Sequence, residues 1–187
     1  MIGEVMPHPV PTRRVTQIVA AGRALLEAEG PEALSMRNVA GRIGIRAPSL
    51  YEHVADKRAL EDAIIAAGMS EQGAAVGAAI AGVEDPLWAA AMAWRTWALE
   101  HPHLYRMIFA RGLNRDDPDV LRAEIAAGDP IRALTKGDLG AARVIWAFAH
   151  GMVMLELNER FPPGYELDEL WQRGIETLRT LIEGSGD

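Results

Sequence analysis

The sequence of residues 34–57 is LSMRNVAGRIGIRAPSLYEHVADK, and it contains two short helical patterns separated by a glycine. Ser35 is a predicted N-cap, and the apolar residues that follow it indicate a short helix ending at a left-handed glycine, Gly44. A second helix is predicted from Ala47 to His53. Two short helices joined by a tight turn form a helix-turn-helix pattern.

The second helix has one face that suits the major groove of DNA, which is about 12 Å wide. Leu50 and Val54 are expected to hold this helix against a core, while Ser49, Tyr51 and His53 project outward. The N-terminus of the first helix offers backbone N–H groups that suit a phosphate. A helix pair alone is a weak signal, because antiparallel pairs occur in many all-α domains.

The residues around this pattern complete a three-helix head, which we expect to span residues 12–65. Thr12 is the predicted N-cap of a helix that stops at Gly30-Pro31, and Asp56 caps the helix that follows the pattern. Residues 1–11 contain three prolines and no apolar period, so we expect them to form a flexible tail.

The remainder of the chain, residues 66–187, is also predicted to be helical, because no segment alternates as a strand does. We therefore expect an all-α protein in which the helix-turn-helix head is followed by a second helical domain. Breaks between the helices of that domain are expected at Gly82-Val83-Glu84-Asp85, His101-Pro102-His103, Asn114, Gly128-Asp129-Pro130 and Phe161-Pro162-Pro163-Gly164.

Charge is distributed unevenly along the chain. Residues 12–58 carry eight Lys or Arg against five Asp or Glu, whereas the remaining residues carry eleven against twenty-one. The net charge of −7 argues against a protein that coats nucleic acid generally. A basic segment on an acidic body suits a protein that presents one end to phosphate.

Composition also limits the class of protein. The chain contains no cysteine, which rules out disulfides and thiolate metal sites and fits a reducing cytoplasm. No secretory signal is evident before Arg13, and no window reaches the roughly 18 unbroken apolar residues of a membrane span. We expect a cytoplasmic protein without membrane contact.

The segments Leu34–Ala40, Gly44-Ile45, Ser49–Val54 and Asp56-Lys57, with Leu60, resemble the DNA-binding signature of the tetracycline-repressor (TetR) family. The resemblance covers about residues 12–65. It implies a homodimer that binds a palindromic DNA operator, and a C-terminal domain that binds a small molecule and then releases the DNA. It also implies a set of DNA-contacting positions: Ser35, Arg37, Arg46, Ala47, Pro48, Ser49, Tyr51, His53 and Lys57.

The sequence departs from the family pattern at three places. Arg46 stands where a serine usually caps the recognition helix, and Ala47-Pro48 replaces a pair that often supplies a cation. We expect Arg46 to supply that cation instead, and Pro48 fits a first helical turn. Gly22 stands where alanine is usual, which allows close packing but costs about 1 kcal/mol of helix propensity.

The segment Trp146-Ala147-Phe148-Ala149-His150-Gly151 resembles the W-x-x-x-H-G motif of one C-terminal domain class in this family, and His103–Phe109 resembles the segment upstream of it. The resemblance implies a ligand-binding domain. We expect an effector cavity within residues 86–157 that takes a small, mostly apolar molecule. Its expected lining is Trp88, Met92, Tyr105, Phe109, Trp146, His150, Val153 and Met154.

Two of these assignments have structural alternatives. Trp146 and His150 lie four residues apart on one helix face, so they also fit a packed core pair. The last helix carries an apolar stripe too long for a solvated helix, which predicts a dimer interface at Trp171, Ile175 and Leu178, or else an intrachain core.

The sequence thus predicts a ligand-responsive repressor. One alternative is a helical protein-interaction module that has lost DNA binding, and another is an enzyme that uses His150 with Glu156 or Asp168. We expect no enzyme, because no nucleophile motif or phosphate loop is present. The histidine spacing predicts no metal site, and we expect no cofactor.

Overall fold

The computed structural model describes the backbone of residues 12–183 and the side chains of residues 12–180, which leaves the expected tail at residues 1–11 outside the described residues. Within this range every regular element is a helix and there is no strand, which confirms the all-α fold. The chain divides into two compact units between Ile64 and Ile65. No described helix is both long and apolar enough to cross a membrane.

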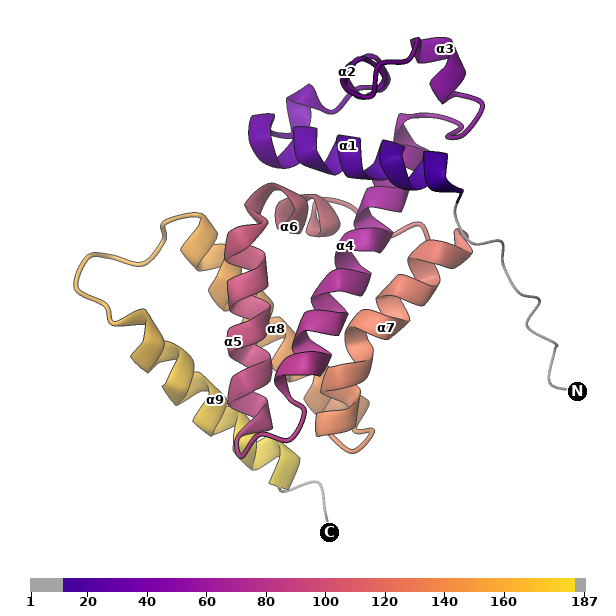
Figure 1. Ribbon diagram of the computed structural model, residues 1–187. Coiled ribbons are helices and arrows are strands. Elements are labelled where there is room, and N and C mark those ends of the chain that lie inside the picture. Colours follow the sequence, from indigo (N-terminus) through magenta and orange to yellow (C-terminus); the bar gives the residue numbers. More distant parts are fainter. Residues whose placement is uncertain (1–11, 184–187) are drawn as a thin grey trace, which may run out of the picture. The chain divides into compact units, whose positions relative to one another are not determined.

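The first unit contains α1 (Arg13–Glu29), a 3-10 turn η1 (Pro31–Ala33), α2 (Met36–Arg42), α3 (Ala47–Leu50) and the start of α4 (Lys57–Ala79) (Figure 1). Helix α1 packs against η1 and α2, and α2 packs against α3. The predicted caps are confirmed, since the side chains of Thr12, Ser35 and Asp56 each accept a hydrogen bond from a backbone N–H of the helix that follows. The core of this unit contains Ile18, Leu26, Leu34, Val39, Leu50, Leu60 and Ile64.

The turn between α2 and α3 depends on one glycine. Gly44 has φ +71°, as predicted, and its N–H bonds to the carbonyl of Gly41 at 3.2 Å. The N–H of Ile45 bonds to the carbonyl of Ala40 at 3.0 Å. These two bonds form a Schellman motif, which satisfies the last carbonyls of α2 and turns the chain toward α3.

Helix α3 is shorter than predicted. Its α-helical span ends at Leu50, and residues 51–53 form turns instead of continuing the helix to His53. The N–H groups of Tyr51 and His53 bond to carbonyls three residues earlier, Pro48 and Leu50. Such bonds tighten the last turn of a helix, so Tyr51 and His53 lie just after α3 and not within it.

The second unit contains the rest of α4, then α5 (Pro86–Glu100), α6 (Pro102–Phe109), α7 (Pro118–Leu134), α8 (Leu139–Leu157) and α9 (Leu167–Glu183). Helices α5, α8 and α9 lie side by side and pack on one another (Figure 1). Helix α7 also contacts α5 and α8. Asp85, Asp117 and Asp138 cap α5, α7 and α8. Trp94, Trp97, Leu104 and Ile145 are buried in the core of this unit.

The break predicted at Gly128-Asp129-Pro130 is wrong, because α7 continues through Pro130 to Leu134. A proline inside a helix removes the N–H that would bond to the carbonyl four residues earlier, here that of Ala126. That carbonyl lies against Gly73 of α4, where a Cβ atom would be only 2.9 Å from the oxygen. The carbonyl that loses its helical donor therefore lies at the contact between α7 and α4.

The residues chosen for the dimer interface lie in the core of the chain, which corrects that prediction. Trp171 is 0% exposed, Ile175 is 2% exposed and Leu178 is also buried, because this stripe of α9 packs on α5 and α8. The prediction's alternative, an intrachain core, holds for these three residues. Of the other apolar residues in this stripe, Leu167 and Leu170 are half-buried, and Leu181 and Ile182 lie outside the described side chains.

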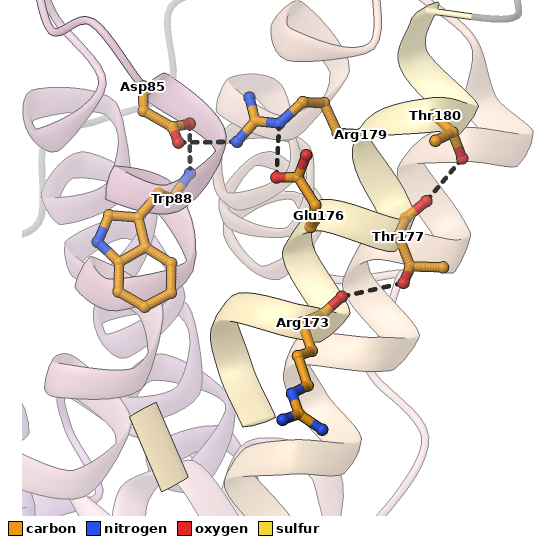
Figure 2. A network of polar contacts seen from close by, with 7 residues as sticks. All are labelled: Asp85, Trp88, Arg173, Glu176, Thr177, Arg179 and Thr180. Carbon is orange, nitrogen blue, oxygen red and sulfur yellow. Dashed lines mark hydrogen bonds and ion pairs between the residues drawn. The ribbon is translucent and has the colours of Figure 1, made fainter. Parts of the chain in front are cut away.

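Polar contacts join α9 to the start of α5. Asp85 accepts a hydrogen bond from the N–H of Trp88 at 3.1 Å and pairs with Arg179 of α9 at 2.7 Å (Figure 2). Burial alone would raise the pKa of Asp85, but the bonds from Arg179 and Trp88 lower it below its ordinary value. The N-cap of α5 is therefore also an ion-pair partner of α9.

Candidate functional site

The first candidate site is the surface around α3. Leu50 is fully buried and Val54 is buried, while Tyr51 is 52% exposed and His53 is exposed. This confirms the predicted division into an anchoring face and an outward face, except that Ser49 is only half exposed. The short α3 is thus held by its apolar side and leaves the aromatic and imidazole side chains open to solvent.

Exposed basic residues lie before and after Tyr51 and His53 in the sequence. Arg37 follows the N-cap of α2, Arg46 is the N-cap residue of α3, and Lys57 begins α4. All three side chains are exposed, and Lys57 forms only a wide ion pair with Glu61, at 3.6 Å. Exposed cations of this kind can bind phosphate without first breaking a buried interaction.

The remaining predicted positions lie on the same turn region. Ser35 is half-buried, and its Oγ accepts a hydrogen bond from the N–H of Asn38 at 3.2 Å, so it caps α2. Ala47 is half exposed and Pro48 is exposed, in the first turn of α3. Arg58 is a further exposed cation next to Lys57 that the sequence analysis did not select, although its charge was counted in the basic segment.

The second candidate site is a cavity of about 620 Å³ inside the second unit. Its walls come from α4, α7, the first half of α8, the end of α6 with the segment that follows it, and one residue of α5. The apolar part of the lining consists mainly of Met69, Trp94, Ile108, Phe109, Leu113, Ile125, Ile131, Leu139 and Trp146.

Only Phe109 and Trp146, of the eight predicted lining residues, border this cavity. Val153 is fully buried in the core, and Trp88, Met92 and Met154 are partly exposed elsewhere in the unit. The structure moves the cavity toward α4 and α7, whereas the prediction placed it between the Trp-rich helix and the long helix. The sequence pattern could not show this, because helix periodicity does not specify which helices leave a gap.

His150 and Tyr105 lie behind the cavity wall. The Oη of Tyr105, which is fully buried, accepts a hydrogen bond from Trp94 at 3.1 Å and bonds to His150 Nδ1 at 2.9 Å. The His150 ring stacks on Trp146 with parallel planes, 5.6 Å between centroids, and lies 4.2 Å from Phe109. Burial lowers the pKa of His150, which favours the neutral ring. His150 therefore supports the two aromatic residues that do face the cavity.

The polar part of the cavity lining was missed by the sequence analysis. It consists of Gln72, Arg111, Arg115, Glu124, Arg132 and Arg143. Arg115 and Glu124 form two hydrogen bonds, at 2.5 and 2.7 Å, and these bonds lower the pKa of Glu124. The available signal was the run of arginines between positions 111 and 143 in a domain that is acidic overall.

The residues proposed for an enzyme are not gathered into one site. His150 bonds to Tyr105, while Glu156 and Asp168 both bond to Arg95, at 3.0 and 2.6 Å. Burial alone would lower the pKa of Arg95, but its bonds to the two carboxylates raise it. In the part of the chain that is described, no three His, Asp or Glu side chains form a group that could hold a metal ion.

A helix-turn-helix head with exposed cations, joined to a helical unit that contains a cavity, defines the class of DNA-binding regulators that respond to a ligand. Residues 18–64 match the family described as bacterial regulatory proteins, tetR family. Residues 87–178 match the tetracyclin repressor-like C-terminal domain. The chain belongs to the TetR family of transcriptional regulators, whose members are not enzymes.

Individual relatives agree with this assignment. An uncharacterized HTH-type transcriptional regulator of Mycobacterium tuberculosis is 30% identical over 151 residues, covering 75% of this chain and 69% of that protein. A protein of unknown function from Rhodococcus sp. RHA1 has a similar structure, with 25% identity, a TM-score of 0.74, and coverage of 97% and 98% of the two chains. Apo ActR from Streptomyces coelicolor is 18% identical and has the same fold, with a TM-score of 0.67. The match covers 96% of this chain and 99% of that chain.

Proposed function

We propose that this regulator is a repressor that binds a palindromic operator as a homodimer and leaves it when a small effector enters the cavity of the second unit. The observation that carries the proposal is the surface around α3. Tyr51 and His53 are exposed there, directly after the helix that Leu50 anchors and between the exposed cations Arg46 and Lys57 in the sequence. This is the arrangement that a recognition helix needs in a major groove.

The proposal assigns two roles to the residues of the first unit. Ser35, Tyr51, His53 and Lys57 bind phosphates, which supplies most of the affinity and fixes the position of the head on the duplex. Arg37, Arg46 and Ser49 contact base edges or the backbone, with Ala47 and Pro48 close to the DNA in the first turn of α3. A palindrome requires two such heads, hence a dimer.

The exposed face of α8 is the surface that we propose for dimerisation. Val144 is 47% exposed and Leu155 is 43% exposed, and both lie on one side of the helix with Ala147 and Gly151. A Cβ atom placed on Gly151 would touch nothing within 4 Å, so a partner helix can approach closely there. This surface replaces the buried residues of α9 that the sequence had suggested.

The effector acts by favouring one arrangement of the dimer over another, since a ligand with equal affinity for both arrangements shifts neither. Helix α4 connects the two functions within one element. Its first residue, Lys57, belongs to the proposed DNA contacts, and Met69 and Gln72 of the same helix line the cavity. We propose that ligand-dependent shifts of α4 alter how the two heads fit the operator.

DNA binding can be tested with the purified chain and DNA fragments from the region that flanks its own gene. Affinity should fall steeply with salt, with a log–log slope of about −0.9 per phosphate contacted. Lys57→Ala should reduce the size of that slope by about one unit without changing the preferred sequence. Fluorescence anisotropy at several salt concentrations measures both quantities.

Lys136 provides the matched control, because it is the other lysine of the chain and lies in the second unit. The backbone of Lys136 has φ 51°, a conformation that asparagine tolerates. Lys136→Asn should therefore leave the salt dependence of DNA binding unchanged. If the wild-type chain binds no duplex, or binds with an affinity independent of salt, the protein is the interaction module considered above and the proposal fails.

A further inference from the structure

The cavity of the second unit is lined by an excess of positive charge. Arg111, Arg115, Arg132 and Arg143 contribute to its walls, and Glu124 is the only acidic residue in the described lining. Arg115 pairs with Glu124, and Arg132 pairs with Asp129, which lies outside the lining. The lining itself carries four cations and one carboxylate, in a chain whose net charge is −7.

The residues that line the cavity differ in their exposure. The side chain of Arg115 is 62% exposed and Arg143 is also exposed, whereas Met69 and Ile108 are buried. Arg115 and Arg143 therefore lie where the cavity meets solvent, together with the exposed Ile125 and Leu139, whereas Arg111 and Arg132 are half-buried. Arg143 attracts Glu124 through space, and this attraction contributes to the lowered pKa of that carboxyl group.

One of the polar residues in the cavity lining is deeply buried. Gln72 of α4 is only 2% exposed, and its side-chain Nε2 has no hydrogen-bond partner among the described residues. A buried donor without an acceptor costs about 1–3 kcal/mol, and native proteins rarely leave one without a purpose. Because Gln72 lines the cavity, a ligand with a carbonyl or ether oxygen can supply the missing acceptor.

We propose that the ligand of this cavity is an amphipathic organic anion: an apolar, preferably aromatic body, an acceptor oxygen that bonds to Gln72, and an anionic group held by the arginines at the mouth. The proposed ligand is the effector of the proposed function, now given a chemical class. Its effect on DNA binding rests on the proposed function, whereas its binding to the cavity does not. It modifies the expectation of a mostly apolar effector by adding a required charge. Guanidinium groups suit this charge because they form paired hydrogen bonds with carboxylates.

Three related compounds test the proposal on the full-length chain without DNA: 4-(2-naphthyl)-4-oxobutanoate, its methyl ester, and 4-(2-naphthyl)butanoate, which lacks the ketone. Isothermal titration calorimetry should show the keto acid binding about tenfold or more tightly than its neutral ester. Arg143→Gln should remove most of this difference by weakening the acid and not the ester. Added salt should weaken the acid selectively, because the arginines at the mouth are exposed.

Gln72→Leu tests the buried donor while keeping the volume of the side chain. It should weaken the keto acid about fivefold and leave the acid without the ketone unchanged, since a neutral hydrogen bond contributes about 1 kcal/mol. Arg173→Gln is the matched control for charge, because Arg173 is an exposed arginine of α9 outside the cavity lining. That variant should bind all three compounds as the wild type does.

The inference is overturned if the ester binds as well as the acid, if Arg143→Gln and Arg173→Gln behave alike, or if no compound binds at about 1 mM. The proposed function fails separately. If the keto acid binds with the expected charge dependence but leaves DNA binding unchanged at saturation, the ligand class stands and the effector role is lost. If DNA is bound and is released by a neutral apolar compound alone, the regulator stands and the anion is rejected.

Discussion

At the scale of single residues, Glu156 joins three helices of the second unit. Its side chain is 6% exposed and accepts hydrogen bonds from Arg95 of α5 at 3.0 Å and from the indole Nε1 of Trp171 at 2.5 Å. Arg95 also bonds to Asp168 and lies over the Trp171 ring. The fully buried indole of α9 is thus positioned by a carboxylate of α8.

Removal of this carboxylate should be costly. Glu156→Ala leaves the Trp171 donor without its acceptor and Arg95 with one partner fewer, so we expect a loss of about 3 kcal/mol in the free energy of unfolding. Glu169→Ala is the control, because Glu169 is exposed and forms only a 4.0 Å pair with Arg173; it should cost less than about 0.5 kcal/mol. Urea denaturation measures both, and equal effects would show that the network does not stabilise the unit.

Two glycines of the helix-turn-helix allow a second comparison at this scale. Gly44 has φ +71° and Gly41 lies within α2, yet a Cβ atom at either position would meet nothing within 4 Å. Gly44→Ala should therefore destabilise the head by about 1 kcal/mol through backbone strain alone. Gly41→Ala should stabilise it by up to about 1 kcal/mol. Hydrogen exchange of the α2 amides measures both changes, and effects of the same sign would contradict the assigned turn.

At the scale of elements, α4 and α7 approach each other closely at Gly73. Gly73 allows the α7 backbone to approach, since a Cβ atom there would lie 2.8 Å from Ala127 Cα. The same contact covers the Ala126 carbonyl that Pro130 leaves without its helical donor. One helix thus depends on a small residue of another, and both helices contribute walls to the cavity.

This contact predicts opposite outcomes for two neighbouring glycines of α4. Gly73→Ala should force α4 and α7 apart and cost about 1–3 kcal/mol, because the obstacle is backbone that cannot rotate away. Gly77→Ala should be neutral or stabilising by up to about 1 kcal/mol, since its nearest neighbour, Pro130 Cγ, would lie at an ordinary 3.7 Å. Thermal denaturation distinguishes the two, and a harmless Gly73→Ala would refute the close packing.

At the scale of the whole molecule, the proposed dimer places an apolar stripe of α8 at the interface. Leu155→Glu should convert the dimer into a folded monomer, because the dimer would bury the new charge without a partner. Leu121→Glu, on the exposed face of α7, should leave the dimer intact. Light scattering at micromolar concentration gives the mass of each variant. A monomeric wild-type chain, or a dimeric Leu155→Glu variant, would exclude this interface.

The sequence by itself determined the features that depend on residues close together in the chain. The caps at Thr12, Ser35 and Asp56 and the left-handed turn at Gly44 were predictable, because each is a bond or dihedral angle within a few residues. The exposed face after α3 was predictable for the same reason, since helical periodicity separates Leu50 and Val54 from Tyr51 and His53.

Only the tertiary structure decided the features that depend on distant segments. Helix α7 continues through Pro130, where the local sequence predicts a break, and its backbone packs on Gly73, more than fifty residues earlier in the chain. Trp171 is core and not interface because α5 and α8 cover it. The arginines of the cavity are scattered over residues 111–143 and line one cavity only when the helices pack. Periodicity shows which face of a helix is buried, but the partner of that face is chosen by the packing of the whole unit.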